Sequence, residues 1–552
     1  MYEKPSSFTW VSLRNVPSSP KNTGELCIIV HEQIQKNTHA HLCDLRSEVD
    51  MTHSPEKMIA SMYASQKELS ALAPSEVHPG EVVLYIQSAN GKRYRVTMKQ
   101  GKAGTPKDVP FTFRFPDGEV ATITRKDENG YNSEYDVRFA HTKGIVLGLI
   151  FTSENPEIKI RKWVLQKLID TIADMGDTLG NHEWEIKALS TKIQESTKPK
   201  KTSQKKKWEK IDISAKITEW KARISQLRSV NIPDIQNKLK SKETEKIRTE
   251  TEMEKFPKYV SFAYSPYQPS FDLPKTREEG MKYIGEGVQS AYRNIATNDP
   301  NKANDFRVHT PASVVLLLNV IERMDFHQYI DATKPQKIVT GTERIKQWKK
   351  YVEKEISVPA VITKDKKAIN TLMYDQMNRA LTVFALNREW AYNFQVSDVW
   401  AAGIAQLMPN TYTGLRNKHS NMLWNTPERP LDGSRIHDIS FQYQAVHVYD
   451  QYTQFPGWIQ RNWDTLMTDP DTRLGVYMIL ACGYNGTMST VMREAGITKE
   501  EPEDMKKLLS PNMILSRFQR LDHKHASERY TYALKFQYLY KQLRQDTVTP
   551  QK

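Results

Sequence analysis

Two glutamates in this sequence each follow an apolar stretch, a setting in which a carboxyl group can act as an acid. Glu322 comes directly after residues 314–321, and Glu389 follows residues 381–386 after two intervening positions. Burial against apolar side chains raises the pKa of a carboxyl group, so that the group keeps its proton near neutral pH. A protonated carboxyl of this kind is the general acid that the opening of a glycosidic bond requires.

The two candidate acids differ in their surroundings. The stretch before Glu322 is the more apolar, whereas Arg388 stands beside Glu389 and favours the ionised form of that carboxyl if the two side chains meet. We therefore favour Glu322 as the acid and keep Glu389 as the alternative. For either residue, the simpler interpretation is a helix-terminal carboxylate in a surface ion pair.

Two short motifs follow both glutamates. The first is Gly403-Ile404-Ala405-Gln406, and the second, about eighty residues later, is Gly483-Tyr484-Asn485-Gly486. In this order they resemble the Gly-Leu-Met-Gln and Ala-Tyr-Asn motifs of the soluble lytic transglycosylases, which are lysozyme-like enzymes that cut the glycan strands of peptidoglycan. The segment from Glu389 to Asn393, followed by Val396-Ser397, is similar to the family's sequence after the catalytic Glu. The apolar helix ending at Glu322 is similar to the helix that delivers that Glu. The resemblance covers the C-terminal part of the chain alone.

The resemblance implies roles for five further residues. Ser397 and Gln406 match positions that contact the bound sugar, and Tyr484 and Asn485 match a pair placed against the substrate and the acid. Tyr532, in Glu528-Arg529-Tyr530-Thr531-Tyr532, matches the Tyr of a Glu-Thr-x-x-Tyr motif that faces the active site. Three of the five also have a local interpretation: Ser397 as a helix cap, Gln406 as a solvent-facing side chain, and Tyr532 as part of an amphipathic helix.

Three departures from the family pattern affect the sugar sites. Ala405 replaces the family's Met, the residue after the acid is Arg323 or Trp390 rather than Ser, and Gly486-Thr487 replaces Ala-Gly. A glycan-binding scaffolding protein without catalytic activity, for example in a cell-envelope or phage-tail assembly, therefore remains the alternative function.

The reaction implied by the resemblance is cleavage of the β-1,4 bond between N-acetylmuramic acid and N-acetylglucosamine, with closure of a 1,6-anhydro ring. One carboxyl group suffices, because it first protonates the leaving oxygen and then takes the proton of the attacking C6 hydroxyl. No metal or organic cofactor is implied. His31, Glu32, His39, His41 and Cys43 form a loose cluster without regular metal-ligand spacing.

Composition limits the class of protein. A chain of 552 residues predicts roughly two to four domains. A net charge of +14 favours a polyanionic partner, while three cysteines without regular spacing indicate neither a disulfide framework nor a zinc site. We find no secretory signal and no continuous apolar run of membrane-spanning length. A location in the cell envelope, outside the cell or in a virion therefore requires an export route that the sequence does not show.

The expected fold is multidomain and mainly helical. Residues 1–79 are mixed, and residues 80–152 predict a small all-β module with a hairpin at Asn90-Gly91. Heptads over 156–256 predict an antiparallel coiled-coil hairpin that could hold protein partners, with Pro233 kinking or ending its second helix. Residues 257–275 are Pro-rich and read as a stiff linker, and 276–545 form the expected lysozyme-like helical domain.

The tip of the predicted hairpin, residues 198–207, is rich in lysine. It could touch an anionic polymer or an envelope surface, although a solvated loop is the simpler interpretation. Apart from this tip, the sequence offers little to support nucleic-acid binding. The partner that the family resemblance implies is peptidoglycan.

Overall fold

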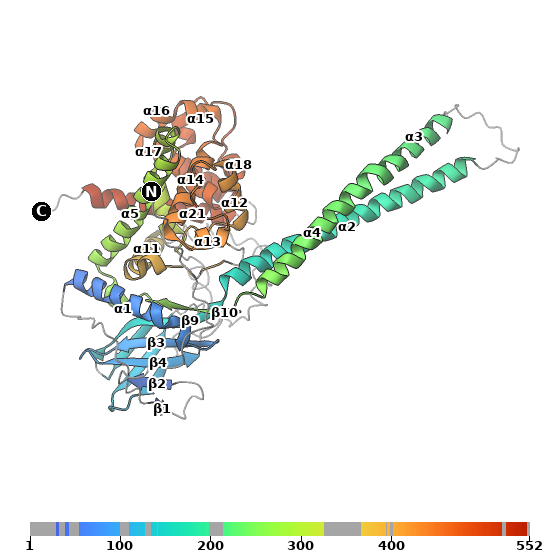
Figure 1. The fold of residues 1–552 in the computed structure, drawn as a ribbon. Coiled ribbons are helices and arrows are strands. Elements are labelled where there is room, and N and C mark those ends of the chain that lie inside the picture. The colour runs from blue at the N-terminus through green and yellow to red at the C-terminus, as the bar shows by residue number, and fades with distance from the viewer. Residues whose placement is uncertain are drawn as a thin grey trace, which may run out of the picture.

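A computed structural model describes eleven segments of the chain. They are residues 29–31, 39–42, 54–99, 110–126, 134–140, 142–197, 213–324, 366–393, 395–397, 401–521 and 526–548. The prediction of a mainly helical chain with a small antiparallel β region near its N-terminus is confirmed (Figure 1). The lysine-rich tip at 198–207 lies outside the described residues, as do Glu32 and Cys43 of the histidine-containing cluster.

The N-terminal part consists of two antiparallel sheets and one helix. The larger sheet has the strand order β1-β2-β4-β3-β9-β10, and the smaller sheet has the order β5-β6-β7-β8. The strands are β1 (Ile29–His31), β2 (His39–Leu42), β3 (Glu81–Gln87), β4 (Arg93–Lys99), β5 (Pro110–Arg114), β6 (Val120–Arg125), β7 (Tyr135–Phe139), β8 (Thr142–Lys143), β9 (Ile145–Glu154) and β10 (Tyr259–Tyr264).

Alternation along β3 explains how the layers pack. Val83 and Tyr85 face the helix α1 (Pro55–Glu76), where they share an apolar cluster with Met62 and Leu69 of that helix. Residues 82, 84 and 86 instead share a core with apolar side chains of the smaller sheet. Successive residues of a strand point to opposite faces of the sheet. The strand β3 is therefore buried on both faces, by α1 on one and by the smaller sheet on the other. Gly91, at φ +83°, makes the predicted turn between β3 and β4.

The segment expected to be a linker, 257–275, is part of the larger sheet. Tyr259 to Tyr264 form β10, which pairs antiparallel with β9 from Tyr259↔Glu154 to Tyr264↔Leu149. The Gln268 side chain then makes two hydrogen bonds to the backbone of Val146. Its Oε1 accepts from the Val146 N–H at 2.6 Å, and its Nε2 donates to the Val146 carbonyl at 2.7 Å. The prolines lie outside the paired positions, so they do not disturb the strand.

A long helical arm leaves the body between β9 and β10 (Figure 1). It consists of α2 (Pro156–Thr197), α3 (Ile213–Gln226), the π-helical turn η1 (Leu227–Asn231) and α4 (Ile232–Met253). Arg223 pairs with Glu185, and Arg161 lies 3.7 Å from Glu252, which sets the two sides antiparallel. Regular α-helical hydrogen bonding is interrupted just before Pro233, and the helical path continues beyond it. The π turn precedes it, and the Ile232 N–H bonds to the Leu227 carbonyl, so α4 begins where proline is tolerated.

The remaining chain forms a helical body above the larger sheet (Figure 1). Its elements are η2 (Pro269–Phe271), α5 (Pro274–Asn298), α6 (Ala303–His309), α7 (Ala312–Ile321), α11 (Lys366–Asn387), η3 (Arg388–Trp390), α12 (Pro409–Lys418), α13 (Pro430–Ser434), α14 (His437–Tyr452), α15 (Gly457–Arg461), α16 (Trp463–Thr468), α17 (Pro470–Tyr484), α18 (Met488–Glu494), α19 (Met505–Leu508), α20 (Pro511–Gln519) and α21 (Ala526–Val548). Among the described residues, no helix is both long and apolar enough to cross a membrane.

The sheet and the helical body share one continuous apolar core. A buried polar joint reinforces it, in which Asn387 at the end of α11 accepts from the Ser265 N–H at 2.8 Å and donates to the Ser265 carbonyl at 3.0 Å. Both backbone groups of Ser265 are thereby satisfied without a strand partner.

Candidate active site

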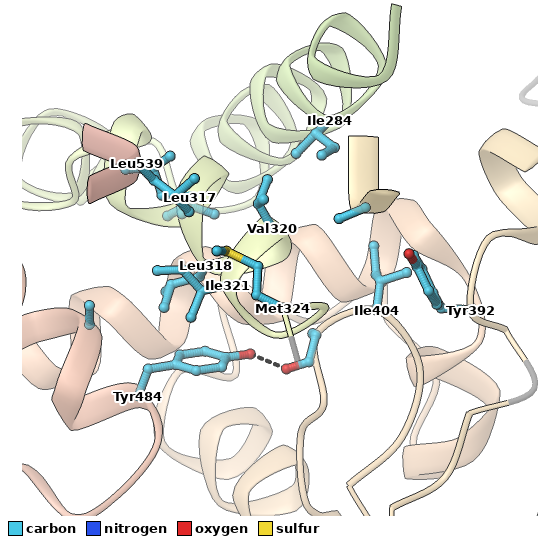
Figure 2. Close-up of a cluster of buried hydrophobic side chains, with 14 of the residues drawn as sticks. Ile284, Leu317, Leu318, Val320, Ile321, Met324, Tyr392, Ile404, Tyr484 and Leu539 are labelled. Carbon is cyan, nitrogen blue, oxygen red and sulfur yellow. Dashed lines mark hydrogen bonds between the residues drawn. The ribbon is translucent and has the colours of Figure 1, made fainter. Parts of the chain in front are cut away.

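Glu322 lies at the C-terminal end of α7, in the middle of the helical body. Its N–H completes the last turn by donating to the Leu318 carbonyl at 3.0 Å. Leu318, Ile321 and Met324 are buried beside it, and Figure 2 shows them around the end of this helix. Glu322 itself is half-buried. The sequence thus places a carboxyl group at the end of an apolar helix, at the edge of the core.

Tyr532 brings α21 to this carboxyl group. Its hydroxyl donates to Glu322 Oε1 at 2.5 Å, across 210 residues of sequence. Burial raises the pKa of Tyr532 well above its ordinary value, with the charge of Glu322 adding to the effect. The phenol therefore stays protonated and remains a donor. Because it binds Oε1, the other carboxyl oxygen of Glu322 is left to carry a proton.

The surroundings of Glu322 favour its protonated form. Burial raises the pKa of this carboxyl above its ordinary value and is the largest influence. The Tyr532 hydrogen bond and the charges of Arg323 and Lys535 oppose burial, and the charge of Glu528 reinforces it. The net direction is upward, which is the condition for a general acid near neutral pH.

Tyr484 connects α17 to the first motif. It is the last residue of α17, it is buried, and its hydroxyl donates to the Ala405 carbonyl, as the dashed line in Figure 2 shows. Burial raises the pKa of Tyr484 well above its ordinary value, and the charge of Glu322 contributes to this rise. The second motif therefore meets the first motif close to Glu322.

The turn containing Gly403 and Gln406 has an unusual backbone. Gly403 has φ +66° and Gln406 has φ +47°, both in the left-handed region. The Gln406 Nε2 donates to the Gly403 carbonyl at 2.7 Å, and an antiparallel bridge between Ala402 and Leu407 closes the turn. A left-handed conformation at a residue other than glycine is strained and is concentrated at functional sites in proteins.

Ser397 and Asn485 are less closely tied to the carboxyl group. The Ser397 hydroxyl accepts from the Ala401 N–H at 3.0 Å, and the Ser397 N–H donates to the Ala401 carbonyl at 2.9 Å, so Ser397 is bonded within its own loop. Asn485 is exposed directly after α17, and its Nδ2 donates to Glu528 Oε1 at 3.2 Å. Glu528 lies one helical turn before Tyr532, so Asn485 reaches the same face of α21.

Glu389 occupies a different environment from Glu322. It is exposed, and its Oε1 accepts from the Tyr63 hydroxyl at 2.7 Å. Arg388 stacks on the same tyrosine, with its guanidinium 4.8 Å from the ring centre. This cluster fastens η3 to α1 of the N-terminal part. Of the two candidate acids, Glu322 is the one in contact with Tyr532 and beside Tyr484.

Sequence reasoning did not assign roles to three charged residues of the site. Arg323 contacts the Gly403–Gln406 turn, Lys535 donates from its Nζ to the Met324 carbonyl, and Glu528 binds Asn485. Lys535 and Glu528 are related to Tyr532 by the helical spacings of three and four residues, and this spacing was the available signal. For Arg323, the signal was its position beside the acid.

Other reactive groups do not assemble into a second centre in the described part of the chain. No group of three or more His, Cys, Asp or Glu side chains is placed there to hold a metal ion. Burial raises the pKa of the Cys482 thiol to about 12, which makes it a poor nucleophile.

No protein-family model, curated protein or solved structure matches the chain.

Proposed function

We propose that this chain is a peptidoglycan lytic transglycosylase whose C-terminal helical body is lysozyme-like and whose single general acid and base is Glu322. The observation that carries the proposal is the contact between Glu322 and Tyr532, at the end of an apolar helix and beside Tyr484. It joins three elements that are far apart in sequence around one carboxyl group with a raised pKa. No second carboxylate is needed for this reaction.

In the proposed reaction, the free oxygen of the Glu322 carboxyl gives its proton to the glycosidic oxygen as the bond to C1 of N-acetylmuramic acid breaks. The C6 hydroxyl of the same sugar then attacks C1, and the Glu322 carboxylate takes its proton. Water is not consumed, and the acid is regenerated. The Tyr532 hydroxyl stabilises the carboxylate formed between the two steps, because a hydrogen bond to the charged form favours it.

Gln406 and Asn485 are the proposed sugar-binding residues, because their carboxamide groups are uncharged, as suits the recognition of hydroxyl and N-acetyl groups. Tyr484 has a supporting role, since its side chain is buried and its hydroxyl donates to the Ala405 carbonyl. Ser397 belongs to the same loop as Gln406, and we assign it a supporting role because its hydroxyl is engaged with Ala401.

The proposal is tested with purified peptidoglycan sacculi and mass analysis of the products. Wild-type protein should release fragments with 1,6-anhydro ends, and Glu322→Gln should release none. Glu389→Gln is the matched control, since it changes a glutamate at the end of another apolar helix, and it should remain active. The assignment fails if wild-type protein releases nothing, and the acid is misassigned if Glu389→Gln alone is inactive.

The second candidate function is a glycan-binding scaffold, and the arm favours it. Trp184 is 71% exposed, Val230 60% and Ile247 61%, so the arm presents apolar side chains that do not contribute to a core. Sedimentation with sacculi separates the two functions, because a scaffold would bind sacculi without releasing anhydro fragments. Both functions require a location in the cell envelope, outside the cell or in a virion. The lysine-rich tip remains a candidate contact for an anionic polymer.

A further inference from the structure

Arg323 follows the proposed acid directly, and its side chain reaches the Gly403–Gln406 turn. Its Nη2 donates to the Gly403 carbonyl at 2.6 Å, and its Nη1 donates to Gln395 Oε1. Both acceptors are neutral, and both belong to the loop that leads into and through the first motif. The end of α7 and this loop are thus joined by the fork of one guanidinium group.

The Gly403 carbonyl accepts from three donors on two residues. They are Arg323 Nη2 at 2.6 Å, Gln406 Nε2 at 2.7 Å and the Gln406 N–H at 3.3 Å. A reversed Gln406 amide would place its oxygen against this carbonyl, so the contact sets the orientation of the amide. Arg323 and Gln406 are therefore held by one oxygen atom, and the Gln406 Oε1 is left to accept a hydrogen bond from a ligand.

An aromatic platform fixes the guanidinium. Its centre lies 4.4 Å from the centre of the Tyr392 ring, and Tyr392 packs edge-on against Phe384 at 5.2 Å. Both aromatic side chains are buried. A planar guanidinium group can stack on such a ring while donating two hydrogen bonds in its own plane, which a lysine ammonium cannot reproduce.

We propose that Arg323 is a positioning residue that holds the Gly403–Gln406 turn in place against the Glu322 carboxyl. This inference rests on the proposed function for its consequence in catalysis, but the mechanical link between Arg323 and the turn is testable without it. The charge of Arg323 also lowers the pKa of Glu322 and so opposes the effect of burial. The fork and the charge are separable, since lysine keeps the charge and loses the fork.

Hydrogen–deuterium exchange of the full-length protein tests the mechanical link. The probes are the Ala402, Gly403 and Gln406 amides, which donate to the carbonyls of Leu407, Gln395 and Gly403. Arg323→Met and Arg323→Lys should each speed their exchange about tenfold or more relative to wild type. Arg388→Met is the matched control, because Arg388 also stacks on a tyrosine at the end of an apolar helix, and it should leave these rates unchanged. Unchanged exchange in both Arg323 variants would overturn the inference.

Cleavage of sacculi tests the consequence for the site. Arg323→Lys and Arg323→Met should each lower kcat/KM roughly 100-fold, the effect expected from misplacing a binding group by about 1 Å. In Arg323→Met the basic limb of the pH profile should also move to higher pH, whereas Arg323→Lys should leave it in place. Activity within twofold of wild type in both variants would refute the positioning role. An inactive wild-type protein would refute the proposed function while the exchange result still decides the mechanical link.

Discussion

Replacing Gly403 by alanine should destabilise the helical body and disable the site. The backbone of Gly403 has φ +66°, and a Cβ atom there would lie 1.7 Å from the Ser434 carbonyl oxygen. The left-handed conformation costs a residue with a Cβ about 1–2 kcal/mol. Forcing a backbone carbonyl out of van der Waals overlap adds roughly 1–3 kcal/mol, since interiors are close-packed and rigid. The sum is roughly 2–5 kcal/mol, and we take about 3 kcal/mol as the expected loss.

Gly91→Ala is the matched control for this substitution. Gly91 has φ +83°, and a Cβ atom there meets nothing within 4 Å, so this variant carries the backbone term without the overlap. We expect a loss of about 1–2 kcal/mol for Gly91→Ala and about 3 kcal/mol for Gly403→Ala. The difference between the two variants isolates the contact with Ser434.

Urea unfolding followed by tryptophan fluorescence measures both variants, and release of soluble fragments from sacculi measures activity. The urea midpoint of Gly403→Ala should fall by an amount that corresponds to about 3 kcal/mol in the free energy of unfolding, with the urea dependence unchanged. Gly403→Ala should also be inactive at urea concentrations below its unfolding transition, because the Gly403 carbonyl accepts hydrogen bonds from both Arg323 and Gln406. If Gly403→Ala were no less stable than Gly91→Ala, Gly403 would not lie in close contact with Ser434, and the turn would not be rigid.

Three further predictions concern hydrogen bonds and pH. Tyr532→Phe removes the hydrogen bond that favours ionised Glu322, so the pKa of Glu322 should rise further. The basic limb of the pH–activity profile should then move to higher pH. Tyr63→Phe, which removes a hydrogen bond to Glu389, is the control and should leave the profile in place. Burial lowers the pKa of His437 from 6.5 to about 3, so the unfolded chain binds the proton first as pH falls. The free energy of unfolding of wild type should therefore decrease between pH 7 and pH 4 in urea titrations. In His437→Gln this decrease should be smaller by roughly 3 kcal/mol. Asn387→Leu leaves the buried Ser265 N–H and carbonyl without partners and should cost roughly 3 kcal/mol, whereas Asn298→Leu, which is only half-buried, should cost less; equal losses in urea unfolding would contradict the importance of the joint.

Local patterns predicted much of the fold. The Asn90-Gly91 turn, the alternating aromatic residues of β5 and β7, and the apolar heptads of α2 all act over short stretches of chain, so a reader of the sequence can find them. The strand β10 could not be found in this way. Its six residues lie among prolines, and its partner β9 is separated from it by the entire arm. Pairing over such a distance leaves no periodic signal near the strand.

The candidate site was predictable to the extent that its residues have recognisable chemistry. An apolar helix that ends in a carboxyl group indicated Glu322, and the resemblance of residues 528–532 to a family motif indicated Tyr532. The choice between Glu322 and Glu389 was not settled by sequence, because both follow apolar stretches and the difference arises from what packs against them. Tyr63 of α1 reaches Glu389 from 326 residues away, and Tyr532 reaches Glu322 from 210. Such contacts exist only after folding.

The arm sets a distance as well as a surface. At 1.5 Å per residue, the 42 residues of α2 extend roughly 60 Å, and α3 and α4 run back alongside them. A molecule bound at the outer end would therefore be kept roughly that far from the body. Deleting one heptad from each side would preserve the interhelical register and shorten the reach by about 10 Å. The length of the arm can thus be changed without altering the residues around Glu322.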